Sequence, residues 1–240
     1  MAASTNMNRL AQVERFIVLY PEQDRLANLQ NCWNWYDTRN GRAQREAESI
    51  ACAVDHICLT QPVDPRRMAV AGLSAGAGMA SLLAVRQPER FQAVVMHSGV
   101  GPGLASSPAT ALGAMRGRRV PVPLMPLVAG LHLPSLLVIQ GSADPIVAPG
   151  NGAKVAQLWA DREGAQAGRP RTVQRGKRYP AKITDYCNRG RRVATLCLVS
   201  GLGHAWSGGE PGLAYSDPNG PDASRMAWSF MKKQFAQRAR

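Results

Sequence analysis

One short turn constrains this chain more than any other feature of its sequence. The apolar run Met68–Ala71 leads into Gly72–Gly76, which reads G-L-S-A-G, and the stretch Ala75–Arg86 is rich in Ala, Leu and Met. Strand, G-x-S-x-G and helix in this order is the context in which a tight turn exposes a serine hydroxyl above a sheet. The amino end of the following helix favours developing negative charge. The turn therefore predicts a strand–turn–helix unit with Ser74 as a candidate nucleophile.

Apolar runs alternate with helix-forming runs along the chain, which predicts the α/β fold class. The expected buried strands are Phe16–Tyr20, Met68–Ala71, Ala93–His97, Ser135–Gln140 and Val193–Val199. The expected helices are Arg42–Cys58, Ala75–Arg86, Asn151–Ala160 and Asp222–Gln237. Because strands joined through helices run parallel, we expect a mostly parallel central sheet flanked by helices.

The length of the chain favours one domain. Its 240 residues, of which 45% are hydrophobic and 19% charged, are typical of a globular unit with its own core. Residues 99–133 contain Pro, Gly and Ser throughout and are expected to form a cap-like excursion over the carboxyl edge of the sheet. No apolar run is long enough to span a membrane, and the N-terminus lacks the pattern of a signal peptide.

The net charge of +13 comes in large part from the segment between Arg169 and Arg192. Such a segment binds nucleic acid or an anionic surface in some proteins and is a solvated loop and hairpin in others. No nucleic-acid motif or interleaved aromatic residue accompanies it, so we expect the hairpin and no nucleic-acid partner. The five cysteines fit no zinc spacing, and a disulfide involving Cys32 and buried free thiols stand as equal alternatives.

Two further segments supply the groups that a serine nucleophile needs, which are a base and an acid that orients it. Asp144 follows the expected strand Ser135–Gln140, and His204 follows Val193–Val199, so both lie where strands end. The order Ser, Asp, His is the one found when a G-x-S-x-G turn carries the nucleophile. Read singly, Asp144 could be an Asx turn and His204 a loop histidine. Their joint order predicts a catalytic triad instead.

The remaining histidines fit the role of base less well. His56 falls in an expected helix, and His132 falls in the excursion. His97 ends a strand and could line the site, but it precedes the acid in the chain. With His204 as base, Ser74 would attack an ester and form an acyl-enzyme that water then releases. The backbone amide of Ala75 is one expected oxyanion donor. This chemistry requires no metal and no organic cofactor.

Several stretches outside the triad resemble one family, the polyhydroxybutyrate depolymerase family of esterases, which also holds feruloyl and acetylxylan esterase-like members. The similar stretches are Tyr20–Gln23 (YPEQ), Asn31–Tyr36 (NCWNWY), Asp64–Arg67 (DPRR), Ala71–Gly76 (AGLSAG), Gly203–Gly209 (GHAWSGG) and Asp217–Ser224 (DPNGPDAS). The tryptophan-containing stretches are more specific to the family than the serine turn. The resemblance runs from about residue 6 to the end of the chain.

The resemblance implies one α/β-hydrolase catalytic domain over residues 1–240, with Ser74, Asp144 and His204 as its triad. It implies hydrolysis of hydroxyalkanoate oligomers or polyester, with a feruloyl or acetylxylan ester as the alternative substrate class. It places Trp33, Trp35 and Trp206 in the substrate cleft, and core packing is the alternative role for these side chains. An extracellular or periplasmic location is also implied.

The chain departs from the family pattern in two places. Gln140 stands before Gly141 where the family commonly has His, and the chain opens without the N-terminal strands that supply the second oxyanion amide. We therefore expect a shortened gene product in which Phe16–Tyr20 pairs directly with the nucleophile strand, or in which a groove with unpaired backbone groups opens between them. Loss of one oxyanion donor costs about 10²–10³ in rate. A weakly active or inactive homologue, or a binding protein, is the alternative to an active esterase.

Overall fold

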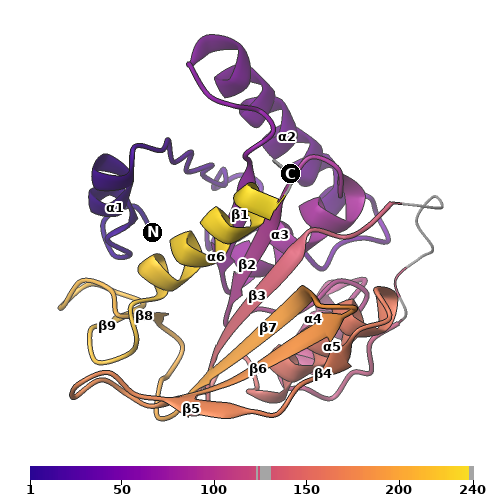
Figure 1. The fold of residues 1–240 in the computed structure, drawn as a ribbon. Coiled ribbons are helices and arrows are strands. Elements are labelled where there is room, and N and C mark those ends of the chain that lie inside the picture. Colours follow the sequence, from indigo (N-terminus) through magenta and orange to yellow (C-terminus); the bar gives the residue numbers. More distant parts are fainter. Residues whose placement is uncertain (123, 125–130, 238–240) are drawn as a thin grey trace.

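The structure is a computed structural model that describes residues 1–122, 124 and 131–237 (Figure 1). The helices are α1 (Met7–Glu14), α2 (Arg42–Thr60), α3 (Ala75–Arg86), α4 (Pro108–Met115), α5 (Gly150–Arg162) and α6 (Ala223–Gln237). The strands are β1 (Ala69–Leu73), β2 (Ala93–His97), β3 (Ser135–Gly141), β4 (Gln166–Ala167), β5 (Arg171–Val173), β6 (Ala181–Asn188), β7 (Arg191–Val199), β8 (Trp206–Ser207) and β9 (Ser216–Asp217).

The central sheet has the strand order β1-β2-β3-β7-β6-β4, and β5 also pairs with β6. The strands β1, β2, β3 and β7 run parallel, whereas β6 is antiparallel to β7. The carboxyl ends of four neighbouring strands therefore lie along one edge of the sheet. The short pair β8–β9 follows β7 in the chain and forms a separate ladder.

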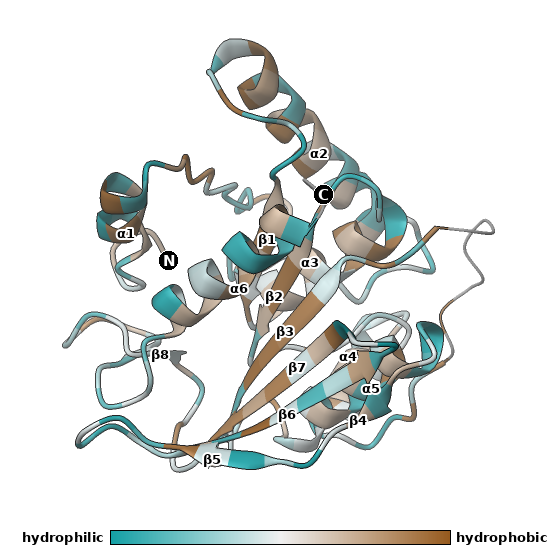
Figure 2. Ribbon diagram, in the orientation of Figure 1, coloured by the Kyte–Doolittle hydropathy of each residue, from teal (hydrophilic) through white to brown (hydrophobic). Residues whose placement is uncertain are grey.

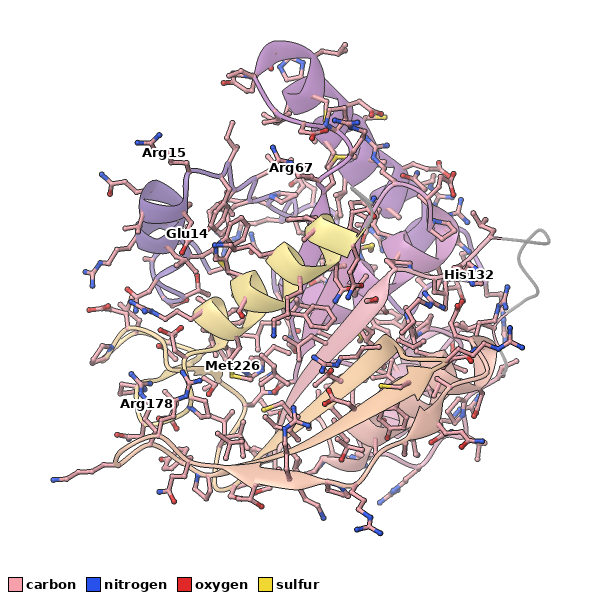
Figure 3. All side chains as sticks on the ribbon, viewed as in Figure 1. Glu14, Arg15, Arg67, His132, Arg178 and Met226 are labelled. Atoms are coloured by element: carbon pink, nitrogen blue, oxygen red, sulfur yellow. The ribbon has the colours of Figure 1, made fainter. Side chains whose placement is uncertain are left out.

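Helices cover both faces of the parallel part of the sheet. On one face α6 packs over β2 and β3, and α1 packs against α6 (Figure 1). On the other face α3 covers β1 and β2, α5 covers β3 and β7, and α2 packs on α3. Figure 2 shows the central strands coloured as hydrophobic, in keeping with strands buried on both faces. An ion pair connects α6 to α1: Nζ of Lys232 lies 2.8 Å from Oε2 of Glu14. Glu14 is labelled in Figure 3.

Most of the predicted elements are confirmed. Helix α3 has the bounds predicted for it, and β2 does as well. The prediction of a strand at Phe16–Tyr20 is wrong: the segment forms neither helix nor strand and pairs with no described strand, although its side chains alternate between half-buried and exposed. Of the two expected arrangements, direct pairing with β1 is therefore absent among the described residues, and β1 lies at the edge of the sheet.

The basic segment forms the antiparallel hairpin of β5, β6 and β7, as the solvated-hairpin interpretation predicts. Several of its charges are paired: Arg171 and Arg192 contact Asp185, and Arg191 contacts Glu163. Arg178, labelled in Figure 3, donates to backbone carbonyls in the loop before α6. All five cysteines are free thiols, and only Cys197 among them is buried.

The excursion after β2 carries α4, which the sequence did not signal. Ser107 caps the helix and forms a reciprocal capping box with Thr110. The end of α4 is held against α5, because the side-chain amide of Asn151 donates to the backbone carbonyls of Ala114 and Met115 at 3.0 Å. Residues 123 and 125–130 of this excursion lie outside the described residues. In the described part of the chain, no helix is long and apolar enough to cross a membrane.

Candidate active site

Ser74 lies at the junction of β1 and α3 in a backbone conformation that is unusual for a residue with a side chain. Its φ and ψ angles are 56° and −120°. Such a conformation costs about 1–3 kcal/mol and persists only where the surroundings hold it. One such contact is the hydrogen bond from the Ser74 amide to the carbonyl of His97 in β2, at 2.9 Å. The turn thus has the strained geometry predicted for a nucleophile at this position.

The close approach of β1 and α3 depends on Gly72. A Cβ atom on Gly72 would lie 2.2 Å from the backbone of Gly76, a distance that real Cβ atoms do not adopt. A Cβ on Gly76 would meet nothing within 4 Å. The two glycines of the motif therefore differ: packing requires the first, whereas the space around the second would accept a side chain.

Ala75 is the first residue of α3, so its amide is one of the N-terminal amides that have no acceptor within the helix. The dipole of α3 adds partial positive charge at the same place. This is the position that an oxyanion donor next to a nucleophilic serine must occupy. Ala75 remains the proposed oxyanion donor.

Asp144 lies in the loop after β3 and its side chain is fully buried. Its Oδ1 accepts hydrogen bonds from the amides of Ile146 and Val147 at 2.9 and 2.8 Å. Its Oδ2 accepts from Nδ1 of His204 at 2.8 Å and from the side-chain amide of Gln140 at 3.3 Å. Burial alone would raise the pKa of Asp144, but the hydrogen bonds from His204, Val147 and Ile146 outweigh it and lower the pKa below its ordinary value.

His204 follows β7, and its Nδ1 faces Asp144 Oδ2. An ionised carboxylate only accepts, so Nδ1 carries the proton and Nε2 is left free to accept one. The ring of Tyr215 meets the imidazole edge to face, with centroids 6.3 Å apart. Tyr215 is 62% exposed, and its φ of 55° is again in the left-handed region. An exposed aromatic ring is thereby held beside the candidate base.

The structure brings two of the three predicted triad residues into contact. In the described part of the chain, no hydrogen bond joins the Ser74 hydroxyl to His204. The turn that carries Ser74 and the loop that carries His204 are instead connected through His97 in β2, which accepts a hydrogen bond from each. Contacts of this kind are often long before substrate binds. Ser74, Asp144 and His204 all follow strands whose carboxyl ends share one edge of the sheet. The arrangement can perform nucleophilic acyl transfer once Ser74 and His204 meet.

His97, which was predicted only as a residue that could line the site, lies between the turn that carries Ser74 and the loop that carries His204. It is completely buried, and its Nε2 accepts a hydrogen bond from the amide of Ser207 at 3.1 Å. Burial and the nearby His204 lower the pKa of His97 to about 3, against a smaller opposing effect of Asp144. The ring is therefore neutral at physiological pH. No motif signals this residue, because its neighbours come from the register of β2 and not from adjacent sequence.

The three tryptophans lie in different surroundings. Trp206 is 1% exposed, stacks on His97 with centroids 5.1 Å apart and donates to the Ser224 hydroxyl at 3.1 Å. This burial favours core packing over the cleft role for Trp206. Trp33 packs on the cluster between α2 and α3. Trp35 is half-buried and packs on a hydrophobic cluster that includes Val147, which lies in the loop that carries Asp144. Trp35 therefore remains a candidate for substrate contact.

Gln140, which departs from the family pattern, supports the acid directly. Its amide nitrogen lies 3.3 Å from Asp144 Oδ2 and 3.2 Å from the carbonyl of Val147. The same amide therefore holds both the carboxylate and the loop whose N–H groups bind it. As for metals, no group of three or more His, Cys, Asp or Glu residues among those the structure describes could hold an ion.

A family model described as "Esterase PHB depolymerase" matches residues 1–169. The chain belongs to this family. Poly(3-hydroxyalkanoate) depolymerase C of Paucimonas lemoignei is 27% identical over 210 residues, covering 84% of this chain and 50% of that protein. Acetylxylan esterase A of Emericella nidulans is 27% identical over 189 residues, covering 72% of this chain and 60% of that protein. This family member thus spans only about half to three fifths of the length of these two relatives.

Among solved structures, an acetyl xylan esterase from Aspergillus awamori has a similar fold, with a TM-score of 0.59 at 20% identity. The match covers 72% of this chain and 68% of that one. The family member therefore has the α/β-hydrolase fold, as its sequence predicts.

Proposed function

We propose that this chain is a carboxylic ester hydrolase in which Ser74 is the nucleophile, His204 the base and Asp144 the orienting acid. The observation that carries the proposal is the hydrogen bond between Asp144 and His204 at the same sheet edge as the strained Ser74 turn. Membership of an esterase family supports the reaction class. We further propose that residues 1–240 act as one catalytic domain.

The proposed reaction begins when Nε2 of His204 takes the proton of the Ser74 hydroxyl as its oxygen attacks the ester carbonyl. Asp144 keeps the Nδ1 proton in place and stabilises the imidazolium that forms. The amide of Ala75 stabilises the negative charge on the carbonyl oxygen. His204 then gives the proton to the leaving alcohol, and an acyl-enzyme remains. Water, activated by the same histidine, releases the acid.

For the substrate we propose short hydroxyalkanoate oligomers or polyester, in line with the depolymerase of Paucimonas lemoignei. Half-buried Trp35 and exposed Tyr215 are the proposed apolar contacts for such an acyl chain. An acetylated polysaccharide is the second candidate, because acetylxylan esterases appear both among the relatives and as a solved structure with this fold. Release of hydroxybutyrate from trimers, compared with release of acetate from acetylated xylan, separates the two.

The first test is hydrolysis of p-nitrophenyl acetate and butyrate by the parent chain and by Ser74→Ala. We expect turnover by the parent and a loss of about 10⁶ in kcat in the variant. Ser49→Ala, which changes a serine on the exposed side of α2, is the matched control and should keep parental activity. Equal turnover by the parent and Ser74→Ala would contradict the proposal.

A further inference from the structure

His97 is a buried titratable side chain at the carboxyl edge of the sheet, and the proposed reaction does not use it. It ends β2, between the strand that carries Ser74 and the strand that leads to Asp144. Its side chain is 0% exposed, so it cannot touch a substrate. Any role in the reaction must therefore act through other residues.

The backbone and the side chain of His97 bind different halves of the site. Its carbonyl accepts the hydrogen bond from the Ser74 amide at 2.9 Å. Its ring accepts the hydrogen bond from the Ser207 amide at 3.1 Å, three positions after His204 in the chain. His97 thus contacts both the nucleophile turn, residues 72–76, and the base loop, residues 200–207 after β7.

The protonation of the ring is fixed by these contacts. A backbone amide only donates, so Nε2 of His97 must be unprotonated, and the proton lies on Nδ1. Nδ1 then donates to the Ser98 hydroxyl at 3.1 Å. Ser98 is in turn held by its amide, which donates to the carbonyl of Ile139 in β3 at 2.9 Å. The lowered pKa of His97, which keeps the ring neutral, agrees with this geometry.

The base loop is fixed on several sides after His204. Trp206 stacks on the His97 ring, and its amide donates to the carbonyl of Tyr215 at 2.8 Å. The Ser207 hydroxyl donates to the carbonyl of Pro221 at 2.6 Å. Of these contacts, only those made by His97 connect the loop to β2 and so to the nucleophile turn.

We propose that His97 is a positioning residue that sets the distance between Ser74 and His204, by holding the nucleophile turn with its carbonyl and the base loop with its ring. This role rests on the proposed esterase function. A shift of about 1 Å between reacting groups costs about 10²-fold in rate. Because His97 touches no substrate, its loss should lower kcat and leave KM unchanged.

The test compares three substitutions that keep different parts of the imidazole. His97→Gln places an amide oxygen where Nε2 stands and can accept from Ser207. His97→Leu has similar size and no acceptor. His97→Asn reaches only the Nδ1 position, so it can contact Ser98 but not Ser207. His56→Leu, on the exposed side of α2, is the control that should keep parental kcat.

We expect kcat for p-nitrophenyl butyrate to fall about 10- to 100-fold in His97→Leu and His97→Asn, because a buried amide loses its acceptor. In His97→Gln we expect kcat to return to near the parental value, with KM unchanged in all variants. Each rate is taken per folded molecule, from a melt in the same buffer. Equal losses in Leu and Gln, or parental kcat in Leu, would overturn the proposal, and His97→Asn decides the matter if Leu does not fold.

A second readout does not depend on turnover. The Nδ1 proton of His204, bonded to Asp144, should give a downfield NMR resonance in the parent and in His97→Gln. We expect this resonance to be lost or broadened in His97→Leu or His97→Asn. If the parent shows no Ser74-dependent hydrolysis, the proposed function fails, and this resonance then decides whether His97 holds the loop that carries His204. Its retention in the Leu and Asn variants would overturn that role.

Discussion

The two halves of the candidate active site differ in how firmly the fold holds them. The acid–base half lies after β3 and β7, and each of these strands has a neighbour on both sides. Asp144 there accepts four hydrogen bonds, from Ile146, Val147, Gln140 and His204. The nucleophile half lies after β1, which pairs on one side only among the described residues. Its serine is held in a strained conformation by its packing against α3 and by His97.

This difference indicates where the site is weakest. A strained backbone conformation survives only if its surroundings over-determine it. The acid–base half is held by many contacts. The conformation of Ser74, in contrast, is held by β2, by the close packing at Gly72 and by the start of α3. Changes to the residues that hold the backbone of the nucleophile half should therefore affect stability and dynamics first, and changes to the acid–base half should affect chemistry first.

Within the acid–base half, the largest effect on chemistry is expected from Asp144→Asn, in which the side chain keeps its shape but no longer fixes the tautomer of His204. We expect kcat to fall by about 10⁴. The measurement is the steady-state rate with p-nitrophenyl butyrate. Asp161→Asn, on the exposed side of α5, is the matched control and should change kcat less than about twofold. A loss smaller than tenfold in Asp144→Asn would mean that this carboxylate does not orient the base.

The next largest effect separates the two glycines of the nucleophile turn. Gly72→Ala should lower the free energy of unfolding by at least about 3 kcal/mol, because its Cβ would overlap the backbone of α3. Gly76→Ala, where a Cβ meets nothing within 4 Å, should change it by less than about 1 kcal/mol. Urea unfolding measures both. Equal effects of the two substitutions would show that β1 and α3 do not pack this closely.

A third prediction concerns the pH dependence of stability. His97 is neutral in the folded chain, with its pKa lowered from 6.5 to about 3. The unfolded chain therefore binds one more proton between these values, so the stability linked to His97 is complete above pH 6.5 and is lost as the pH falls toward 3. The slope is at most about 1.4 kcal/mol per pH unit. Urea unfolding at several pH values should show a weaker acid dependence for His97→Gln than for the parent and for His56→Gln, and equal dependence would contradict a buried neutral His97.

The smallest expected effect is a difference in amide exchange between the two halves. The backbone groups of β1 that face away from β2 have no strand partner among the described residues, whereas β3 is paired on both sides. We expect amides of β1 to exchange at least about tenfold faster than those of β3. Hydrogen exchange read by mass spectrometry measures this. Equal protection of β1 and β3 would indicate that another segment covers the open edge.

The sequence predicted the parts of the fold that local pattern determines. The helix after Ser74 was placed to the residue, because its composition and the following Pro88 fix both ends. The failure at Phe16–Tyr20 has a physical reason: an apolar extended segment becomes a strand only when a neighbour supplies ladder hydrogen bonds. The strand β6 was missed as a separate element, since its sequence AKITDYCN includes Lys182, Asp185 and Asn188 and forms no apolar run.

The candidate site was predictable to the extent that chain order and strand ends specify it. Asp144 and His204 were found in this way, and they are in contact in the structure. His97 was predicted only to line the site and Tyr215 was not predicted at all, because their places depend on the register of β2 and on a left-handed turn that sequence does not reveal. Trp206 matched a family motif, yet its ring lies in the core.

The proposed reaction requires that the nucleophile half and the acid–base half form one reactive site. Covalent labelling by a fluorophosphonate, read by peptide mass, tests this directly in the parent, in His204→Ala and in Asp144→Asn. We predict that the label appears on Ser74 and that its rate of attachment falls steeply when His204 or Asp144 is changed. Labelling of another residue, or labelling of Ser74 at the same rate in all three proteins, would contradict it.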